Sequence, residues 1–105
     1  MKGNYSMIDK STAYVLAKKF LETAEYRMGN EDSYMIVEQA TIEKDYGWIF
    51  FYTSRKYIET GDEHYALYGN GPIVVEKSDG STHQLGSAGG SKKQIEMYEA
   101  RRKKN

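Results

Sequence analysis

Apolar side chains recur along the chain at two spacings, the first of which is typical of helices. Between residues 10 and 28 they return every three or four positions, and lysines and glutamates fall outside the stripe. Asp9 is a typical N-cap residue, and Gly29 follows the last periodic position as a left-handed stop. We therefore predict a helix over residues 10–28 with one packed face. That face comprises Ala13, Val15, Leu16, Ala17, Phe20, Leu21 and Ala24.

From Tyr34 onward the spacing becomes that of strands. Residues 35–37 and 40–42 are apolar, but their apolar face switches in the middle, which indicates either a bulge or burial on both sides. Turn residues at 44–47 separate this segment from residues 48–53, which are rich in aromatic and β-branched types. The pattern predicts an antiparallel hairpin over residues 34–53.

A second hairpin is predicted where residues 72–77 pair with residues 81–85. The connecting Ser78-Asp79-Gly80 contains an Asp-Gly pair, which readily takes the left-handed conformations of tight turns. Between the hairpins, residues 56–58 suit a short strand, and residues 65–68 suit either a short strand or a turn of helix.

The last predicted element is a helix that opens at Ser91. Gln94 stands three residues later, as in a capping box, and Ile95 and Tyr98 provide an edge for docking. The fold class is therefore α+β, with an N-terminal helix, a C-terminal helix and an antiparallel sheet of about four strands in two hairpins. At 105 residues, we expect residues 1–105 to form a single domain.

Composition narrows the class of protein. Hydrophobic residues make up 39% and charged residues 29% of the chain, as in ordinary globular proteins. No apolar run approaches the roughly 20 residues that cross a bilayer, and the first residues do not resemble an export signal, so neither a membrane protein nor an exported one is expected. The absence of cysteine excludes disulfides and thiol chemistry and suits a cytoplasmic location.

Charge is balanced overall but unevenly distributed. Residues 22–63 hold ten acidic and four basic residues, whereas residues 92–105 hold six basic and two acidic ones. Such runs are most often solvated faces of helices and strands. With a formal net charge of zero, broad nucleic-acid binding is not expected.

Catalytic and metal sites find little support in the motifs. Ser91 follows Gly89-Gly90 but lacks the final glycine of a nucleophile elbow, and a capping role explains it better. His64 and His83, with nearby carboxylates, have no spacing diagnostic of a metal site. We therefore expect no cofactor and no metal, and interpret His83 as an exposed position on a hairpin strand.

Two further patterns have structural explanations. Gly69-Asn70-Gly71-Pro72 precedes a strand instead of opening a helix, so it is interpreted as a sharp turn and not as a phosphate-binding loop. Asp62 and Glu63 are adjacent, and their side chains diverge in an extended chain, so they do not suit a glycosidase pair.

Aromatic residues are the most distinctive feature of the middle of the chain. Ten tyrosines in 105 residues exceed what a small core can hide, so several should be partly exposed, and tyrosine is a frequent anchor of protein interfaces. Alternatively, the rings of residues 48–52 are core residues. The side chains on one face of this strand would then pack beneath the first helix. The two sets are Trp48, Phe50 and Tyr52, or Ile49 and Phe51.

The segment around these rings resembles the immunity protein 35 family, also called the YrhB type. The resemblance covers roughly residues 34–100 and rests most on its Gly-Trp and Gly-Asn-Gly-Pro elements. It implies a small bacterial α+β protein that protects its producer by binding a toxin of a polymorphic toxin system. The matching residues are Gly47-Trp48-Ile49-Phe50-Phe51-Tyr52, Ser54, Tyr57, Thr60-Gly61-Asp62, Ala66-Leu67, Gly69-Asn70-Gly71-Pro72-Ile73 and Leu85-Gly86.

We therefore expect a cytoplasmic, non-enzymatic antitoxin that covers its cognate toxin, and a homodimer formed through a sheet edge is an open alternative to a monomer. A competing hypothesis is a chaperone-like protein that binds unfolded clients. The expected partner-binding residues are Tyr57, Asp62, Glu63, Tyr65 and Tyr68. The expected fold-determining residues are Gly47, Trp48, Phe50, Gly69, Gly71 and Pro72.

Overall fold

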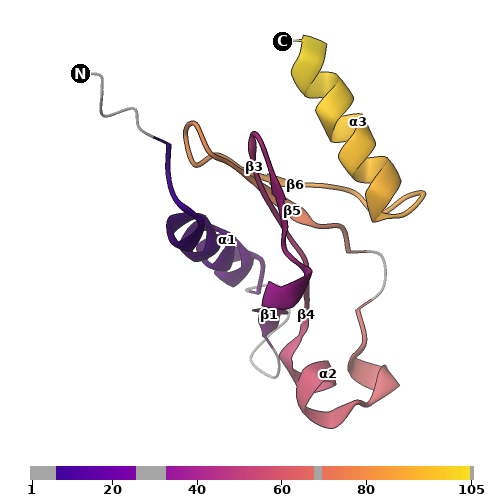
Figure 1. Ribbon diagram of the computed structural model, residues 1–105. Coiled ribbons are helices and arrows are strands. Elements are labelled where there is room, and N and C mark those ends of the chain that lie inside the picture. Colours follow the sequence, from indigo (N-terminus) through magenta and orange to yellow (C-terminus); the bar gives the residue numbers. More distant parts are fainter. Residues whose placement is uncertain (1–6, 26–32, 68–69, 105) are drawn as a thin grey trace.

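Helices cover both faces of antiparallel strands in a computed structural model that describes residues 7–25, 33–67 and 70–104 (Figure 1). The predicted α+β class, with a helix near each end of the chain, is confirmed. The elements are α1 Lys10–Glu25, β1 Tyr34–Ile36, the 3-10 turn η2 Glu38–Ala40, β2 Ile42–Lys44, β3 Gly47–Phe50, β4 Tyr52–Ser54, α2 Arg55–Thr60, the 3-10 turn η3 Glu63–Tyr65, β5 Ile73–Glu76, β6 Thr82–Gln84 and α3 Ser91–Lys104.

The predicted cap of α1 is confirmed, because Asp9 Oδ1 accepts the backbone N–H of Thr12 at 2.8 Å. The helix packs its face on one side of the sheet, whereas its predicted end at residue 28 lies outside the described residues. The prediction was wrong for Val15, which is 48% exposed. At 3.6 residues per turn, a position two residues from both Ala13 and Ala17 lies on the opposite side of the helix.

The hairpin predicted over residues 34–53 is confirmed, but it is divided between two sheets. β1 pairs with β4 in a two-stranded sheet, and β2 pairs with β3 in a larger one. Between these pairings, residues 37–41 of one segment lie opposite only Phe50 and Phe51 of the other. The additional residues of the longer segment form η2. The switch of the apolar face therefore reflects a bulge, one of the two predicted alternatives, which a 3-10 turn fills.

The second predicted hairpin is confirmed as β5 and β6, and it extends the larger sheet to the order β2-β3-β5-β6. Its turn uses the predicted Asp-Gly pair: Asp79 Oδ1 accepts the backbone N–H of Ser81 at 2.8 Å, and Gly80 has a φ of 73°. This hairpin brings residues 76–83 to the same end of the sheet as the β2–β3 turn (Figure 1).

Both faces of the larger sheet are buried, which corrects the expectation of a single core face. Trp48 and Phe50 pack under α1, with Tyr52 at the margin of that cluster. Ile49 faces the other way, and Phe51 packs against the edge of the cluster that it forms with α3. Because each face has its own helix, β5 is apolar at consecutive positions. The second cluster comprises Ile49, Val74, Leu85, Ile95 and Tyr98.

The start of α3 differs from the predicted capping box. Ser91 is already the first helical residue, and the side-chain amide of Gln94 donates to the carbonyl of Ala88 at 2.7 Å. Gln94 therefore reaches back beyond the helix, to a carbonyl of the preceding loop and not to the backbone N–H of an N-cap. The predicted docking edge is confirmed, since Ile95 and Tyr98 are both buried.

Two glycines lie where another backbone approaches too closely for any side chain. A Cβ on Gly47 would lie 2.1 Å from the carbonyl oxygen of Val75, and one on Gly71 would lie 2.1 Å from that of Gly86. These contacts give Gly47 and Gly71 steric reasons to be glycine. Gly69 lies outside the described residues.

Among residues 7–25, 33–67 and 70–104, no helix combines the length and apolarity that a bilayer crossing requires.

Candidate functional site

The α2–η3 segment, residues 55–66, carries most of the predicted partner-binding residues. It was expected to hold a short strand at residues 56–58, but these residues are helical. Ser54 caps α2 by accepting the backbone N–H of Tyr57 at 3.2 Å, and Gly61 ends it with a φ of 70°. A serine cap and a glycine stop seven residues apart thus outweigh the strand preference of Tyr57 and Ile58.

The structure brings three of the five predicted residues together on η3. Asp62 accepts the backbone N–H of His64 at 2.9 Å and so begins the turn that contains Glu63 and Tyr65. The carboxylates of Asp62 and Glu63 are exposed, and the ring of Tyr65 is half-buried. The fourth residue, Tyr57, is half-buried on α2, and the fifth, Tyr68, lies outside the described residues.

One cation and an imidazole ring accompany these groups. The Lys56 ammonium lies 5.3 Å from the centre of the Tyr65 ring, and the His64 ring meets the same ring edge-on. Ile58 on α2 is 53% exposed. The α2–η3 segment therefore presents carboxylates, ring edges and one apolar side chain together, which are the groups that a protein partner can use.

Tyrosines are less exposed than their number suggested. Within the described residues Tyr98 is buried and every other tyrosine is half-buried. Several rings are thus partly accessible, as expected, but each also packs on its own protein. A partner would therefore contact ring edges that are already held in place.

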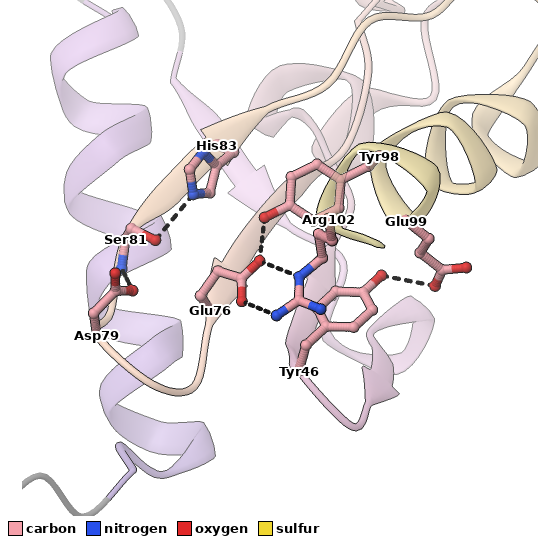
Figure 2. Close-up of polar contacts among 8 residues, drawn as sticks. All are labelled: Tyr46, Glu76, Asp79, Ser81, His83, Tyr98, Glu99 and Arg102. Carbon is pink, nitrogen blue, oxygen red and sulfur yellow. Dashed lines mark hydrogen bonds and ion pairs between the residues drawn. The ribbon is translucent and has the colours of Figure 1, made fainter. Parts of the chain in front are cut away.

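A second cluster, which we call the Glu76 cluster, joins the turn between β2 and β3, the end of β5 and the inner face of α3 (Figure 2). Arg102 donates to Glu76 through Nε and Nη2, both at 2.8 Å, and the Tyr98 hydroxyl also donates to Glu76. The Arg102 guanidinium lies 4.3 Å from the centre of the Tyr46 ring. The cluster comprises Lys44, Tyr46, Glu76, Tyr98, Glu99 and Arg102.

The other contacts of the Glu76 cluster hold α3 through Glu99. The Tyr46 hydroxyl donates to Glu99 at 2.8 Å, and Lys44 pairs with Glu99 at 3.1 Å. Two carboxylates, one from the sheet and one from the helix, are therefore each held by a cation and a phenol. This arrangement sets the position of α3 on the sheet.

Electrostatics keep both carboxylates ionised. Hydrogen bonds from Arg102 lower the pKa of Glu76, although burial opposes them, and the hydrogen bond from Tyr46 lowers the pKa of Glu99. Burial, followed by the hydrogen bond to Glu76, raises the pKa of Tyr98. An ionised carboxylate that already accepts several hydrogen bonds is a poor proton acceptor at neutral pH, so the Glu76 cluster suits positioning better than acid–base chemistry.

A pocket of about 420 Å³ opens beside the Glu76 cluster, between the β5–β6 turn and α3. Within it, Ser81 Oγ and His83 Nε2 lie 2.9 Å apart. A hydroxyl beside an imidazole is the first requirement of nucleophilic catalysis, but Ser81 lies just before β6 and only two residues from His83, and the side chain of Asp79 accepts the Ser81 backbone N–H. The pocket is lined by Glu76, Asp79, Ser81, His83, Tyr98, Arg101 and Arg102.

The two histidines considered as metal ligands lie on different elements. His83 is exposed on β6, and His64 is exposed on η3. Each is the one histidine on its element. In the part of the chain that the structure describes, no group of three or more His, Asp or Glu side chains is placed to hold a metal ion.

Sequence reasoning did not find the Glu76 cluster. One signal was available, because Glu76 is a charged residue that ends a strand of consecutive buried apolar positions. A second was the placement of Tyr98 and Arg102 four residues apart on the last helix, which puts them on one face. Their common partner on β5, however, is 22 to 26 residues away and could not be identified without the fold.

Two comparisons relate the chain to known proteins. A family model described as Immunity protein 35 matches residues 11–101. A protein of Escherichia coli (strain K12) named "Uncharacterized protein YrhB" is 38% identical over 56 residues, which are 53% of this chain and 60% of that relative. The match thus spans less than two thirds of the relative's length. No solved structure matches the chain significantly. The resemblance predicted from the aromatic segment is confirmed.

Proposed function

Because the chain belongs to the immunity protein 35 family, we propose that it binds one cognate toxin domain of a polymorphic toxin system and neutralises it by covering its working surface. Family membership over residues 11–101 carries this proposal. On this proposal the protein acts stoichiometrically in the cytoplasm of the producing cell and performs no turnover.

The proposed contact surface is the α2–η3 segment, with Tyr57, Asp62, Glu63 and Tyr65. Tyr68 stays a proposed contact as well, and it lies outside the described residues. Rings that are held at one edge and accessible at the other lose little entropy on binding, which favours them as anchors of an interface. The exposed carboxylates beside them would orient the partner by charge.

Binding itself is tested by co-expression with a candidate toxin domain taken from the neighbouring genes. We expect the two to purify together and the producing cells to survive expression of the toxin. The proposal would fail if the soluble, folded protein neither retained the toxin domain nor restored growth. Suppressed aggregation of several unrelated proteins, with no tight partner, would instead support the chaperone-like function.

The contact surface is tested by Tyr65→Ala. A central interface ring contributes about 2 kcal/mol or more, so we expect binding to the toxin domain to weaken by about 30-fold or more. Tyr34→Ala is the matched control, since the Tyr34 ring is also half-buried but packs edge-on against Tyr52 at 5.0 Å. Equal losses in both variants would assign the effect to stability, and no loss in either would remove the α2–η3 segment from the proposal.

The oligomeric state of the purified protein is measured alongside toxin binding. β2 is an edge strand of the larger sheet, and Ile42 on it is 37% exposed. We propose the monomer as the form that binds toxin, with light scattering of the purified protein as the check. A stable dimer that dissociates on adding a charge at Ile42 would establish pairing through this edge instead.

A further inference from the structure

The larger sheet has an open edge along β2, and we call residues 41–44 the β2 edge. Among the described strands, β3 is the one that pairs with β2, and Lys44 and Gly47 flank the two-residue turn between them. Such a flanking pair exchanges main-chain hydrogen bonds, so the alternation of an antiparallel ladder directs the N–H and C=O of Glu43 away from β3. The hydrogen bond from the Lys77 N–H to the Tyr46 carbonyl, at 2.7 Å, fits this alternation. The β2 edge therefore offers the main-chain groups of Glu43 to a further strand.

Two pockets flank the β2 edge, one on each face of the sheet. On the side covered by α1, a pocket of about 480 Å³ is lined by Val15, Thr41 and Phe50. On the side covered by α3, a pocket of about 320 Å³ is lined by Ile42 and Ile95 (Figure 1). Neighbouring residues of the edge, Thr41 and Ile42, thus border opposite pockets. Successive side chains of an added strand would point into the two pockets in turn.

Neither pocket has a surplus of charge. One cation and one carboxylate line the α1 side, and two of each line the α3 side. The pockets also reach the core, because Phe50 and Ile95 are both buried. They therefore suit uncharged, apolar side chains. The charged lining residues are Lys10 and Glu38 on the α1 side, and Lys44, Lys92, Glu96 and Glu99 on the α3 side.

A second copy of this chain does not match the β2 edge. Two β2 strands that pair antiparallel about their middle residue place one Glu43 directly opposite the other, and like charges in that position are destabilising. A shift of the register by two residues places Glu43 opposite Thr41 or Asp45 instead. In each of these registers a second copy brings polar or acidic side chains to the α1 side, where Glu38 already lies.

We propose that the β2 edge binds an extended segment of the toxin as an added strand, with two successive apolar side chains of that segment entering the α1-side and α3-side pockets. This inference rests on the proposed function and adds the chemistry of the segment that is bound. Main-chain hydrogen bonds to Glu43 supply affinity in such a complex, and the two pockets supply selectivity for the side chains.

Removal of the outward N–H tests the inference. Glu43→Pro removes this donor at a position where an edge strand tolerates proline, because the N–H is not used in the ladder. Glu43→Ala is the reference, since it loses the same carboxylate but keeps the N–H. We expect Glu43→Pro to bind the candidate toxin domain at least about tenfold more weakly than Glu43→Ala. Circular dichroism and thermal melting establish that each variant is folded.

Thr82→Pro is the matched control on β6, the opposite edge of the larger sheet. The Ser81 carbonyl accepts the Glu76 N–H at 2.9 Å, so the alternation directs the N–H of Thr82 outward as well. This variant should bind the toxin domain like the wild type. Equal weakening by the two proline variants would assign the effect to loss of sheet stability and overturn the inference.

Hydrogen exchange measures the main-chain contact in the wild type. We expect the Glu43 amide to exchange at least about tenfold more slowly in the complex than in the free protein, because it donates to the added strand. The Thr82 amide should exchange equally in both. This measurement decides the inference even where Glu43→Pro does not fold.

The α1-side pocket is tested by a charge at its rim. Val15 is 48% exposed on α1, so Val15→Glu leaves the core intact, and we expect it to weaken toxin binding at least about fivefold. Met97→Glu is the matched control, because Met97 is 42% exposed on α3 and lines neither pocket. The control should bind like the wild type.

Equal binding by the two Glu43 variants, or unchanged exchange of the Glu43 amide in the complex, would overturn the inference and leave the proposed function intact. A dimer of the free protein that Glu43→Pro dissociates would assign the β2 edge to a second copy and overturn it too. A wild-type protein that binds no toxin domain would overturn the proposed function and this inference together.

Discussion

The α2–η3 segment and the Glu76 cluster are built from similar residues but held together differently. In the α2–η3 segment most polar contacts join near neighbours, such as Arg55 with Glu59 and Asp62 with His64, although Arg55 Nε also donates to Ser33 Oγ at 2.9 Å. In the Glu76 cluster they join β5 or the β2–β3 turn to α3, across 22 to 55 residues. The two regions lie toward opposite ends of the molecule (Figure 1). Local contacts organise a surface, whereas the distant ones decide where a whole helix lies.

Replacing a glycine near each region should give the largest difference in stability between the two regions. Gly47 pairs with Glu76 across β3 and β5, and a Cβ there would collide with the Val75 carbonyl. We expect Gly47→Ala to cost about 3 kcal/mol or more in the free energy of unfolding, measured in urea, because two central strands must move apart. Gly61→Ala is the control: its Cβ meets nothing within 4 Å, so only the left-handed φ is strained, for about 1 kcal/mol. Equal costs would contradict this account.

Removing an arginine from the Glu76 cluster should have the next largest effect. Arg102→Ala leaves the buried Glu76 carboxylate with the Tyr98 hydroxyl alone, and we expect a loss of about 2 kcal/mol together with loosened docking of α3. Hydrogen exchange of the α3 amides would show the loosening. The comparison is Glu59→Ala, which removes an exposed pair within one helix and should cost at most about 0.5 kcal/mol. Unchanged protection of α3 in the Arg102 variant would show that the apolar contacts alone hold the helix.

Acid should weaken the Glu76 cluster. The pKa of Glu76 is lowered from its ordinary value of 4.5, chiefly by hydrogen bonds from Arg102, so its contribution to stability is complete above that value and is lost as the pH falls through the lowered pKa. Urea midpoints from about pH 6 to pH 3 should therefore fall less steeply for Glu76→Gln than for the wild type. Glu99, Asp9 and Asp79 titrate in both proteins, so the difference isolates Glu76. Parallel curves would mean that Glu76 stabilises the fold through packing only.

The smallest of the four effects is expected at the cap of α2. Ser54→Ala removes the side-chain oxygen that accepts the Tyr57 amide, and an N-cap is worth about 1 kcal/mol. The change should increase hydrogen exchange in residues 55–60 and leave α3 unaffected. Increased exchange in α3 would show that the two regions are coupled after all.

Most of the fold could be predicted because its signals are local. Asp9 marks the start of α1, and Asp79 with Gly80 marks the turn between β5 and β6; each acts through a backbone group two or three residues away. The helix at α2 has signals of the same kind, in Ser54 and Gly61, but the strand preference of Tyr57 and Ile58 competes with them in the sequence. Burial of both faces of β3 was not predicted, because it depends on where the second helix lies.

The candidate sites differ in the same way: one is built from residues close together in the sequence, and the other from residues far apart in it. Asp62, Glu63 and Tyr65 are consecutive or nearly so, and the structure does bring them together. The Glu76 cluster and the pocket beside it combine residues of the β2–β3 turn, of the second hairpin and of α3. No spacing in the sequence relates these segments until the sheet order is known. The proposed function rests on the resemblance to a family. The comparison over residues 11–101 confirmed that resemblance, while the toxin-binding function and its contact residues stay predictions.

Titration of the toxin's own activity tests the central claim most directly. Increasing amounts of the purified protein are mixed with a fixed amount of the toxin domain, and the remaining activity is measured once binding is complete. A protein that works by covering the toxin should remove activity in proportion to the amount added, with none left at one molecule per toxin domain. Progressive loss of activity at a small fraction of that amount, or full activity in the presence of an excess, would contradict the account.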